Sequence, residues 1–137
     1  MTKHELGEWG TLVLGLYRAS HETALEEFQD AALACVRPLV SFDASMWGTA
    51  TLTDQGIDIH TLHLHRKSPE MMAEYEPLKD LDDAAISLIG LPRATRSFDS
   101  DLLGGPDERR REFRDVLRRH DQNHILITTR HDPATRF

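Results

Sequence analysis

The sequence of 137 residues predicts an α+β fold. In residues 1–40 apolar side chains recur every three or four positions, the spacing of amphipathic helices. After Phe42 the pattern changes to β-branched and alternating residues, which is typical of strands. Helical patterns return from Pro69, and a last β-rich stretch covers Asn123–Arg130. We therefore expect an antiparallel sheet with helices packed against it.

Composition limits the class of protein. The apolar and charged fractions, 39% and 28%, are ordinary for a globular chain of this length. We expect one domain over residues 1–137, with helices in 1–40 and the sheet with its covering helices in 41–137. The formal net charge of −7 argues against direct binding of nucleic acid, which needs a basic face.

Two further features bear on the cellular setting. Cys35 is the single cysteine, which excludes an internal disulfide and a cysteine-based zinc site. The apolar run Thr11–Tyr17 is too short to cross a membrane, and no small-residue cleavage site follows it. We expect a cytoplasmic chain with no membrane partner.

The first helix is predicted to begin at Thr2, because Glu5 stands three residues later, the spacing of a capping box. Its apolar stripe consists of Leu6, Trp9, Val13, Leu16 and Tyr17. Gly7, Gly10 and Gly15 each lower helix propensity by about 1 kcal/mol relative to alanine. We therefore expect this helix to depend on packing against another surface, such as a second copy of the chain.

A second helix is predicted to begin with Ser20 as its N-cap and to end at Pro38. Its expected buried stripe consists of Leu25, Phe28, Ala32, Cys35 and Val36. A hairpin should follow, with strands over 45–52 and 57–65. The turn between them has Gly56 available for the left-handed conformation.

The rest of the chain reads as helices, a loop and one strand. Helices are expected over Pro69–Leu78, Asp80–Gly90 and 106–120. The proline, serine and glycine residues in Leu91–Gly105 predict a long loop, a type of segment that often binds ligands. The strand Asn123–Arg130 completes the sheet, which looks incomplete because the chain ends soon afterwards.

The hairpin carries three histidines that invite a metal-binding interpretation. His63 and His65 are two residues apart on one strand, so they share a face, whereas His60 points to the other face. A third ligand could come from near the last strand, where His120, Asp121 and His124 occur. We take His63, His65 and His124 as the alternative metal set. Ordinary hydrogen-bonded sheet histidines are the favoured interpretation.

A ligand pocket is the other interpretation of this region. Large apolar side chains that could form its wall are Met46, Trp47, Met71, Met72, Tyr75 and Phe98. Trp47 and Tyr75 are the stronger candidates, because each combines a large apolar body with a polar group. The candidate ligand-binding residues are therefore Trp47, His63, Met72, Tyr75 and Phe98. Most of these side chains could equally be plain core.

The helix over 106–120 is rich in arginine. Its basic residues are Arg109, Arg110, Arg111, Arg114, Arg118 and Arg119. Acidic residues alternate with them, so Asp107 and Glu108 can pair with Arg111, and Asp115 with Arg118 or Arg119. This spacing favours a solvated helix face over a phosphate site. The apolar residues expected to face the core are Phe113, Val116 and Leu117.

No pattern of catalytic residues stands out. The serines lack a nucleophile elbow, the Leu103–Pro106 segment lacks the lysine of a phosphate loop, and Cys35 lies on an apolar helix stripe. The acidic run Asp80–Asp83 reads as a helix start. We expect a protein that is not an enzyme and that requires no cofactor.

The element order and six short stretches resemble one family of bacterial regulators. These stretches are Leu16–Ala19, Pro38–Val40, Phe42–Asp43, Trp47–Thr49, Leu62–His65 and Asn123–Thr128. They resemble LuxR-family transcriptional regulators, in which a GAF/PAS-like sensor domain precedes a GerE-type helix-turn-helix. The acyl-homoserine-lactone receptors of that family use a Trp/Tyr/Asp constellation. Only Tyr75 and Asp82–Asp83 fall in a similar place here, so lactone recognition is not carried over.

The resemblance implies a GAF/PAS-like antiparallel sheet covered by helices and a pocket for an unidentified small molecule. It also implies a homodimer formed through the N-terminal helices. DNA would be contacted only through a helix-turn-helix domain that this sequence does not contain. We expect a non-enzymatic sensor domain, with two alternatives: a histidine-based metal- or haem-binding module, or a domain that only dimerises.

Overall fold

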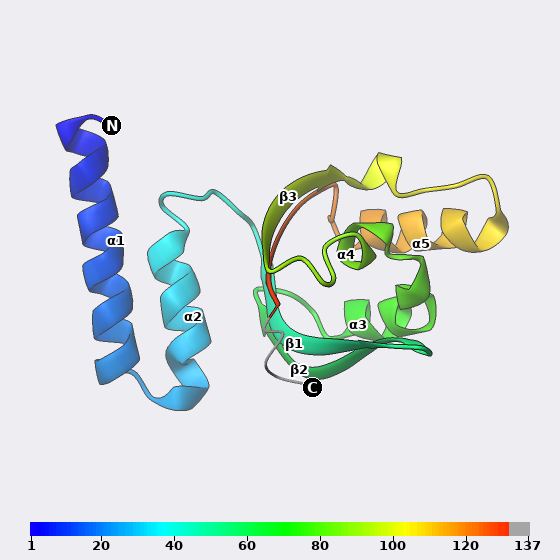
Figure 1. Cartoon of the computed structure of the whole chain (residues 1–137), viewed down its shortest axis with the longest axis horizontal. Helices are drawn as coiled ribbons and strands as arrows, with labels where there is room; N and C mark the ends of the chain where they lie inside the picture. Colours follow the sequence, from blue (N-terminus) through cyan, green and yellow to red (C-terminus); the bar gives the residue numbers. More distant parts are fainter. Residues whose placement is uncertain (132–137) are drawn as a thin grey trace. The chain divides into compact units, whose positions relative to one another are not determined.

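The structure, a computed structural model, describes residues 1–131 (Figure 1). The elements are α1 (Lys3–Glu22), α2 (Leu25–Val36), β1 (Ser45–Thr53), β2 (Gly56–His65), α3 (Glu70–Tyr75), the 3₁₀ helix η1 (Glu76–Leu81), α4 (Asp83–Ile86), β3 (Arg93–Asp99), the 3₁₀ helix η2 (Ser100–Leu102), α5 (Glu108–Arg119) and β4 (His124–Arg130). This mixture of helices and strands confirms the predicted α+β class. The end of the chain, from residue 132 onward, lies outside the described residues.

The described strands form two separate two-stranded sheets, β1 with β2 and β3 with β4. The sequence predicts a single sheet completed by the last strand. That strand, β4, pairs instead with β3, a strand that the sequence does not predict. The pairing is antiparallel and runs from Arg93 opposite Arg130 to Asp99 opposite His124.

The segment 91–105, predicted as a long loop, contains β3 and η2. Turn-forming residue types misled the prediction, because most β3 side chains are polar and face solvent. The strand is held by its partner: Phe98 lies opposite Ile125, and the hydroxyls of Thr95 and Thr128 are 3.0 Å apart. Long-range pairing of this kind outweighs a weak local strand signal.

The described chain divides into two units, which we call the first and second units. The first unit comprises Met1–Thr49 and Thr61–Lys67, and so contains α1, α2 and the open end of the β1–β2 hairpin. The second unit comprises Ala50–His60 and the chain from Ser68 onward, and so contains the hairpin tip and all later elements.

Helix α1 begins as the sequence predicts. The Thr2 hydroxyl accepts a hydrogen bond from the Glu5 amide, and the Glu5 carboxylate accepts one from the Thr2 amide, which completes a capping box. The helix then runs through Ser20, which was predicted to cap the second helix. The Ser20 hydroxyl instead donates to the Tyr17 carbonyl (2.7 Å), a bond that serine can make inside a helix.

Helix α2 begins at Leu25 and ends at Val36, before Pro38 as predicted. It lies antiparallel beside α1 in Figure 1. A Cβ atom on Gly15 would lie 3.1 Å from the Cys35 sulfur, so the small glycine allows the two helices to approach closely. The predicted buried stripe is wrong at Leu25, whose side chain is 83% exposed at the helix start.

In the hairpin, Gly56 adopts a positive φ of 112°, which confirms the predicted turn. Gly48 has a different role. A Cβ atom there would lie 2.3 Å from the Thr61 carbonyl oxygen on the facing strand. The backbones of β1 and β2 therefore approach each other at a point where a side chain does not fit.

The core of the second unit gathers around α5. Its buried members are Met71, Tyr75, Leu78, Ala84, Leu103, Phe113, Val116 and Leu117. The rings of Phe113 and Tyr75 lie 6.2 Å apart. Phe113, Val116 and Leu117 are buried, as the sequence predicts.

The helices predicted over Pro69–Leu78 and Asp80–Gly90 are shorter than expected. Helix α3 ends at Tyr75 and gives way to η1, in which Pro77 lacks the amide that an α-helix would need. Helix α4 covers only Asp83–Ile86. Proline and the capping carboxylate of Asp82 thus divide this region into short pieces.

We predict that Gly48→Ala destabilises the fold by about 1–3 kcal/mol, because the added methyl forces the hairpin backbones apart. Urea unfolding followed by circular dichroism measures the change. The matched control is Gly7→Ala, where a Cβ atom meets open space and helix propensity improves. Equal stability of Gly48→Ala and wild type would contradict the close approach.

We predict that Phe113→Ala lowers the free energy of unfolding by about 3–5 kcal/mol, because its side chain is fully buried in the core of the second unit. The same denaturant series applies. Leu102→Ala is the control, since that side chain is 82% exposed and its removal should change stability by less than about 0.5 kcal/mol.

Candidate functional site

The predicted ligand-binding residues fall in both units. Trp47 and His63 belong to the first unit, whereas Met72, Tyr75 and Phe98 belong to the second. The Trp47 indole is 39% exposed and meets the Phe28 ring of α2 edge-on, with centroids 6.1 Å apart. Trp47 therefore helps to pack the hairpin against α2.

The three candidates in the second unit pack into its core. Met72 and Phe98 are partly buried against the core cluster, and Tyr75 is a member of it. The Tyr75 hydroxyl donates to Asp82 Oδ2 (2.8 Å), while Asp82 Oδ1 accepts the Ala85 amide (2.9 Å). The Asp82 carboxylate therefore caps α4 and also accepts the hydrogen bond of the buried Tyr75 hydroxyl. Contact of these side chains with a ligand remains a prediction.

The structure brings His63 and His65 together with Asp30 of α2. His63 Nε2 donates to Asp30 Oδ1 (2.8 Å), and His65 Nδ1 donates to the same oxygen (2.6 Å). This confirms that the two histidines share a face. The three side chains present one ligand atom each, all within 4.8 Å of one another, as a metal site requires.

Burial and charge differ across this cluster, which we call the His–Asp cluster. The side chains of His65 and His63 are 12% and 20% exposed, and that of Asp30 is 54% exposed. Hydrogen bonds from His65 and then His63 hold the pKa of the Asp30 carboxyl below its usual value. The carboxylate is therefore the charged, solvent-facing member of a site whose imidazoles are partly enclosed.

The third member of the alternative metal set, His124, belongs to a different unit from His63 and His65, and its part in such a site stays a prediction. His124 is on β4 in the second unit, where its ring lies 3.8 Å from the Asp99 carboxylate. His120 is also in that unit and bonds Glu74 (3.1 Å). His60 bonds the Thr51 hydroxyl (2.7 Å).

Asp30 was missed because no sequence periodicity links a helix position to a strand position. It lies 33 residues before His63, and only the packing of α2 against the hairpin brings the two together. One signal was available. Asp30 directly precedes the wholly apolar Ala31–Val36 segment of α2. A charged residue at the edge of an apolar segment often needs a polar partner, and the hairpin histidines were candidates for that partner.

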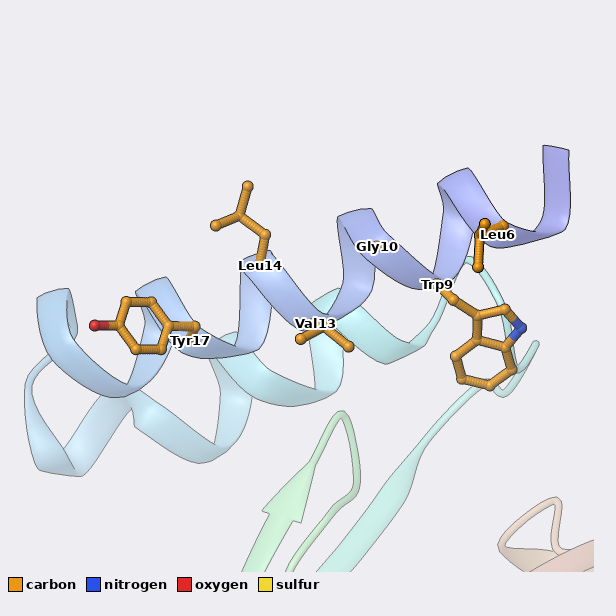
Figure 2. A pocket seen from close by; sticks show the side chains of 6 residues that line it. All are labelled: Leu6, Trp9, Gly10, Val13, Leu14 and Tyr17. Carbon is orange, nitrogen blue, oxygen red and sulfur yellow. The ribbon is translucent and has the colours of Figure 1, made fainter. Parts of the chain in front are cut away.

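A second candidate surface is the outer side of α1 (Figure 2). Its large apolar side chains are exposed by 58% at Leu6, 51% at Trp9, 64% at Val13, 49% at Leu14 and 62% at Tyr17. Gly10 lies among them and leaves a shallow concavity. We call this set, Leu6, Trp9, Gly10, Val13, Leu14 and Tyr17, the α1 apolar face.

Four of the six arginines of α5 pair with acidic residues, mostly on other elements. Arg109 makes a two-pronged contact with Asp80 (3.1 and 3.2 Å) and donates to the Pro77 carbonyl. The remaining pairs are Arg110 with Asp83 and Asp107, Arg118 with Asp101, and Arg119 with Glu74. The predicted pairs within the helix differ from these, because neighbouring elements supply the acids. The engaged arginines do not form an open anion site.

Comparison with protein-family models found no match, and neither did comparison with curated proteins or with solved structures. Across the described part of the chain, no helix combines the length and apolar character needed to cross a bilayer. The function must therefore be argued from the two surfaces above.

We predict that Tyr75 resists ionisation while the fold is intact. Burial, and next the Asp82 carboxylate, raise the pKa of its hydroxyl above the usual value near 10. A raised pKa means that the stabilisation is complete below pH 10 and is lost as the pH rises further. In a Tyr17→Phe variant, which leaves one tyrosine, tyrosinate absorbance should stay absent at pH 10 until the protein unfolds. A normal titration with retained secondary structure would contradict the buried hydrogen bond.

Proposed function

We propose that this chain is a non-enzymatic regulatory sensor module that works as a homodimer joined through the α1 apolar face. The observation that carries the proposal is the exposure of that face (Figure 2). Large contiguous apolar patches on a protein surface are typical of interaction sites. The occupant we assign to it is the same face of a second copy.

The area of the patch fits a dimer. Its five large side chains are each about half exposed or more. Specific interfaces bury about 1,200 Å² in total at their lower end, or about 600 Å² per partner, and a face of two aromatic and three aliphatic side chains is suited to an interface of that size. Helix α1 has 20 residues and is therefore about 30 Å long, enough for several turns of contact.

The spacing of the patch favours a copy of itself as the partner. Within the face, Leu6 and Val13 are seven residues apart, as are Gly10 and Tyr17. A seven-residue repeat is the pattern by which identical helices pair side by side. Gly10 would leave room for a side chain of the other helix. Between Leu6 and Tyr17 the sequence has one charged residue, Glu8, so like-charge repulsion is small.

Burial within the first unit points the same way. Among its described residues, the apolar side chains that are fully buried are two alanines, Ala19 and Ala32. Helix α1 also contains three glycines, which weaken it as an isolated helix. A partner surface would supply the apolar burial that this unit lacks.

The sensory part of the proposal rests on the resemblance to LuxR-type regulators. In that scheme the module, in the cytoplasm, binds a small molecule and reports through the geometry of its dimer to a DNA-binding domain. Such a report requires that the ligand bind one dimer arrangement better than another. Two groups that could act in catalysis have structural roles instead, which supports a non-enzymatic protein. Cys35 packs against Gly15, and Asp82 caps α4.

We predict that the chain without tags is a dimer at micromolar concentration and that Val13→Glu weakens the dimer at least 100-fold. The substitution places a charge in the centre of the apolar face, where it would be buried without a partner. Sedimentation equilibrium measures the dissociation constant.

The matched control is Leu25→Glu, which puts the same charge on an even more exposed apolar position of α2 outside the face. It should leave the dimer unchanged. A wild-type chain that stays monomeric at 100 μM, or a Val13→Glu variant that dimerises like wild type, would refute the proposed interface.

A further inference from the structure

We propose that Asp30, His63 and His65 form a binding site for a divalent transition-metal ion of the zinc type. This inference goes beyond the proposed function and does not depend on dimerisation. All three residues belong to the first unit, which places the site between α2 and β2. The three protein ligands would leave positions for water.

The donor set selects the class of ion. Two imidazole nitrogens and one carboxylate oxygen are the ligands that zinc, iron, nickel and copper accept. Calcium and magnesium prefer a shell made entirely of oxygen atoms. Zinc sites with two histidines and one carboxylate, completed by water, recur among metalloproteins. The His–Asp cluster has the same composition.

The distances require only a small adjustment. Zinc–ligand bonds of about 2.0–2.1 Å in a tetrahedral site place neighbouring ligand atoms about 3.3 Å apart. The two ring nitrogens now lie 2.8 and 2.6 Å from Asp30 Oδ1, and all three atoms fall within 4.8 Å. To reach that spacing the ring nitrogens would move away from Asp30 Oδ1 by about 0.5 and 0.7 Å, within the reach of rotamer adjustment.

The imidazole tautomers of His63 and His65 can change to allow metal binding. In the structure each ring directs an N–H group toward Asp30, from Nε2 of His63 and from Nδ1 of His65. On metal binding, these nitrogens would present lone pairs, and each hydrogen would move to the other nitrogen of its ring. A neutral ring keeps its hydrogen count, so the ion simply replaces two hydrogen bonds.

Burial gives the site an entrance and a rigid base. The two histidines are mostly enclosed and are fixed on one strand face, whereas Asp30 is about half exposed. An ion could therefore enter from the side of Asp30. The Phe42 ring meets the His65 ring edge-on, with centroids 6.1 Å apart, and limits its rotation. Arg37 and Arg66 lie beside His65. Their positive charges would repel a metal cation and so weaken its binding to the site.

A bound ion would join the strand to the helix directly. Asp30 is on α2 and both histidines are on β2, so coordination would replace hydrogen bonds by stronger bonds between these two elements. Because α2 is also the packing partner of α1, the ion would stabilise the first unit as a whole. Ligand binding to the native state raises stability by mass action.

The test is calorimetric titration of untagged, EDTA-treated protein with zinc chloride. We expect one ion per chain with a dissociation constant of about 10 μM or lower. His63→Ala, His65→Ala and Asp30→Asn should each weaken binding at least 30-fold. The matched controls are His60→Ala, on the same strand, and His124→Ala, and both should bind like wild type.

A second measurement covers variants that fold poorly. Zinc should raise the thermal midpoint of the wild type and of the two control variants, but not that of Asp30→Asn, with folding checked by circular dichroism. If Asp30→Asn does not fold, His63→Gln replaces it, since glutamine keeps a hydrogen-bond donor for Asp30 but is a poor zinc ligand. Cobalt should give the visible absorption of a tetrahedral ion in wild type and in the two control variants, but not in Asp30→Asn.

The outcomes separate this inference from the proposed function. Val13→Glu should still bind zinc if the His–Asp cluster is a metal site, whatever its effect on the dimer. Zinc binding that is equal in wild type and Asp30→Asn, or that disappears in His124→Ala, would overturn the inference. So would a wild-type chain whose stability zinc does not change.

Discussion

Apolar burial is the constraint on which the first unit depends. Two alanines are its fully buried apolar side chains among the described residues, while Trp9, Val13 and Tyr17 lie more than half exposed on α1. Hydrophobic burial is the main favourable term in folding, so a helix pair with such a small interior needs further contacts. Two such contacts stand out: the Asp30 carboxylate, which takes hydrogen bonds from both hairpin histidines, and the α1 apolar face, which a second copy would cover.

The second unit obtains its apolar burial from its own residues. Phe113, Val116 and Leu117 of α5 are fully buried, and the Asp82 carboxylate satisfies the Tyr75 hydroxyl in the same core. Arginine side chains on the outer side of α5 pair with acidic residues of neighbouring elements. Each of these surface pairs contributes little to stability by itself. This contrast supports the proposal that a second copy of the chain supplies apolar burial to the first unit.

The sequence predicted the parts of the fold that depend on local chemistry. The capping box at Thr2, the glycine turn at Gly56 and the buried face of α5 are short-range features, and all three were predicted correctly. The strand β3 was missed because its pairing with β4, and not its own composition, decides its conformation. At the candidate site, strand alternation correctly placed His63 and His65 on one face. Their contact with Asp30 depends on how α2 packs against the hairpin, and the periodicity of the sequence does not indicate that packing.

The central claim is that α1 is completed by a second copy of the chain. Hydrogen exchange of the α1 backbone amides, measured across a dilution series, tests it most directly, because protection reports whether the helix is held in place. We expect α1 amides to be protected at high protein concentration and to lose protection on dilution, while α5 amides stay protected throughout. Protection of α1 that does not change with concentration would contradict the account.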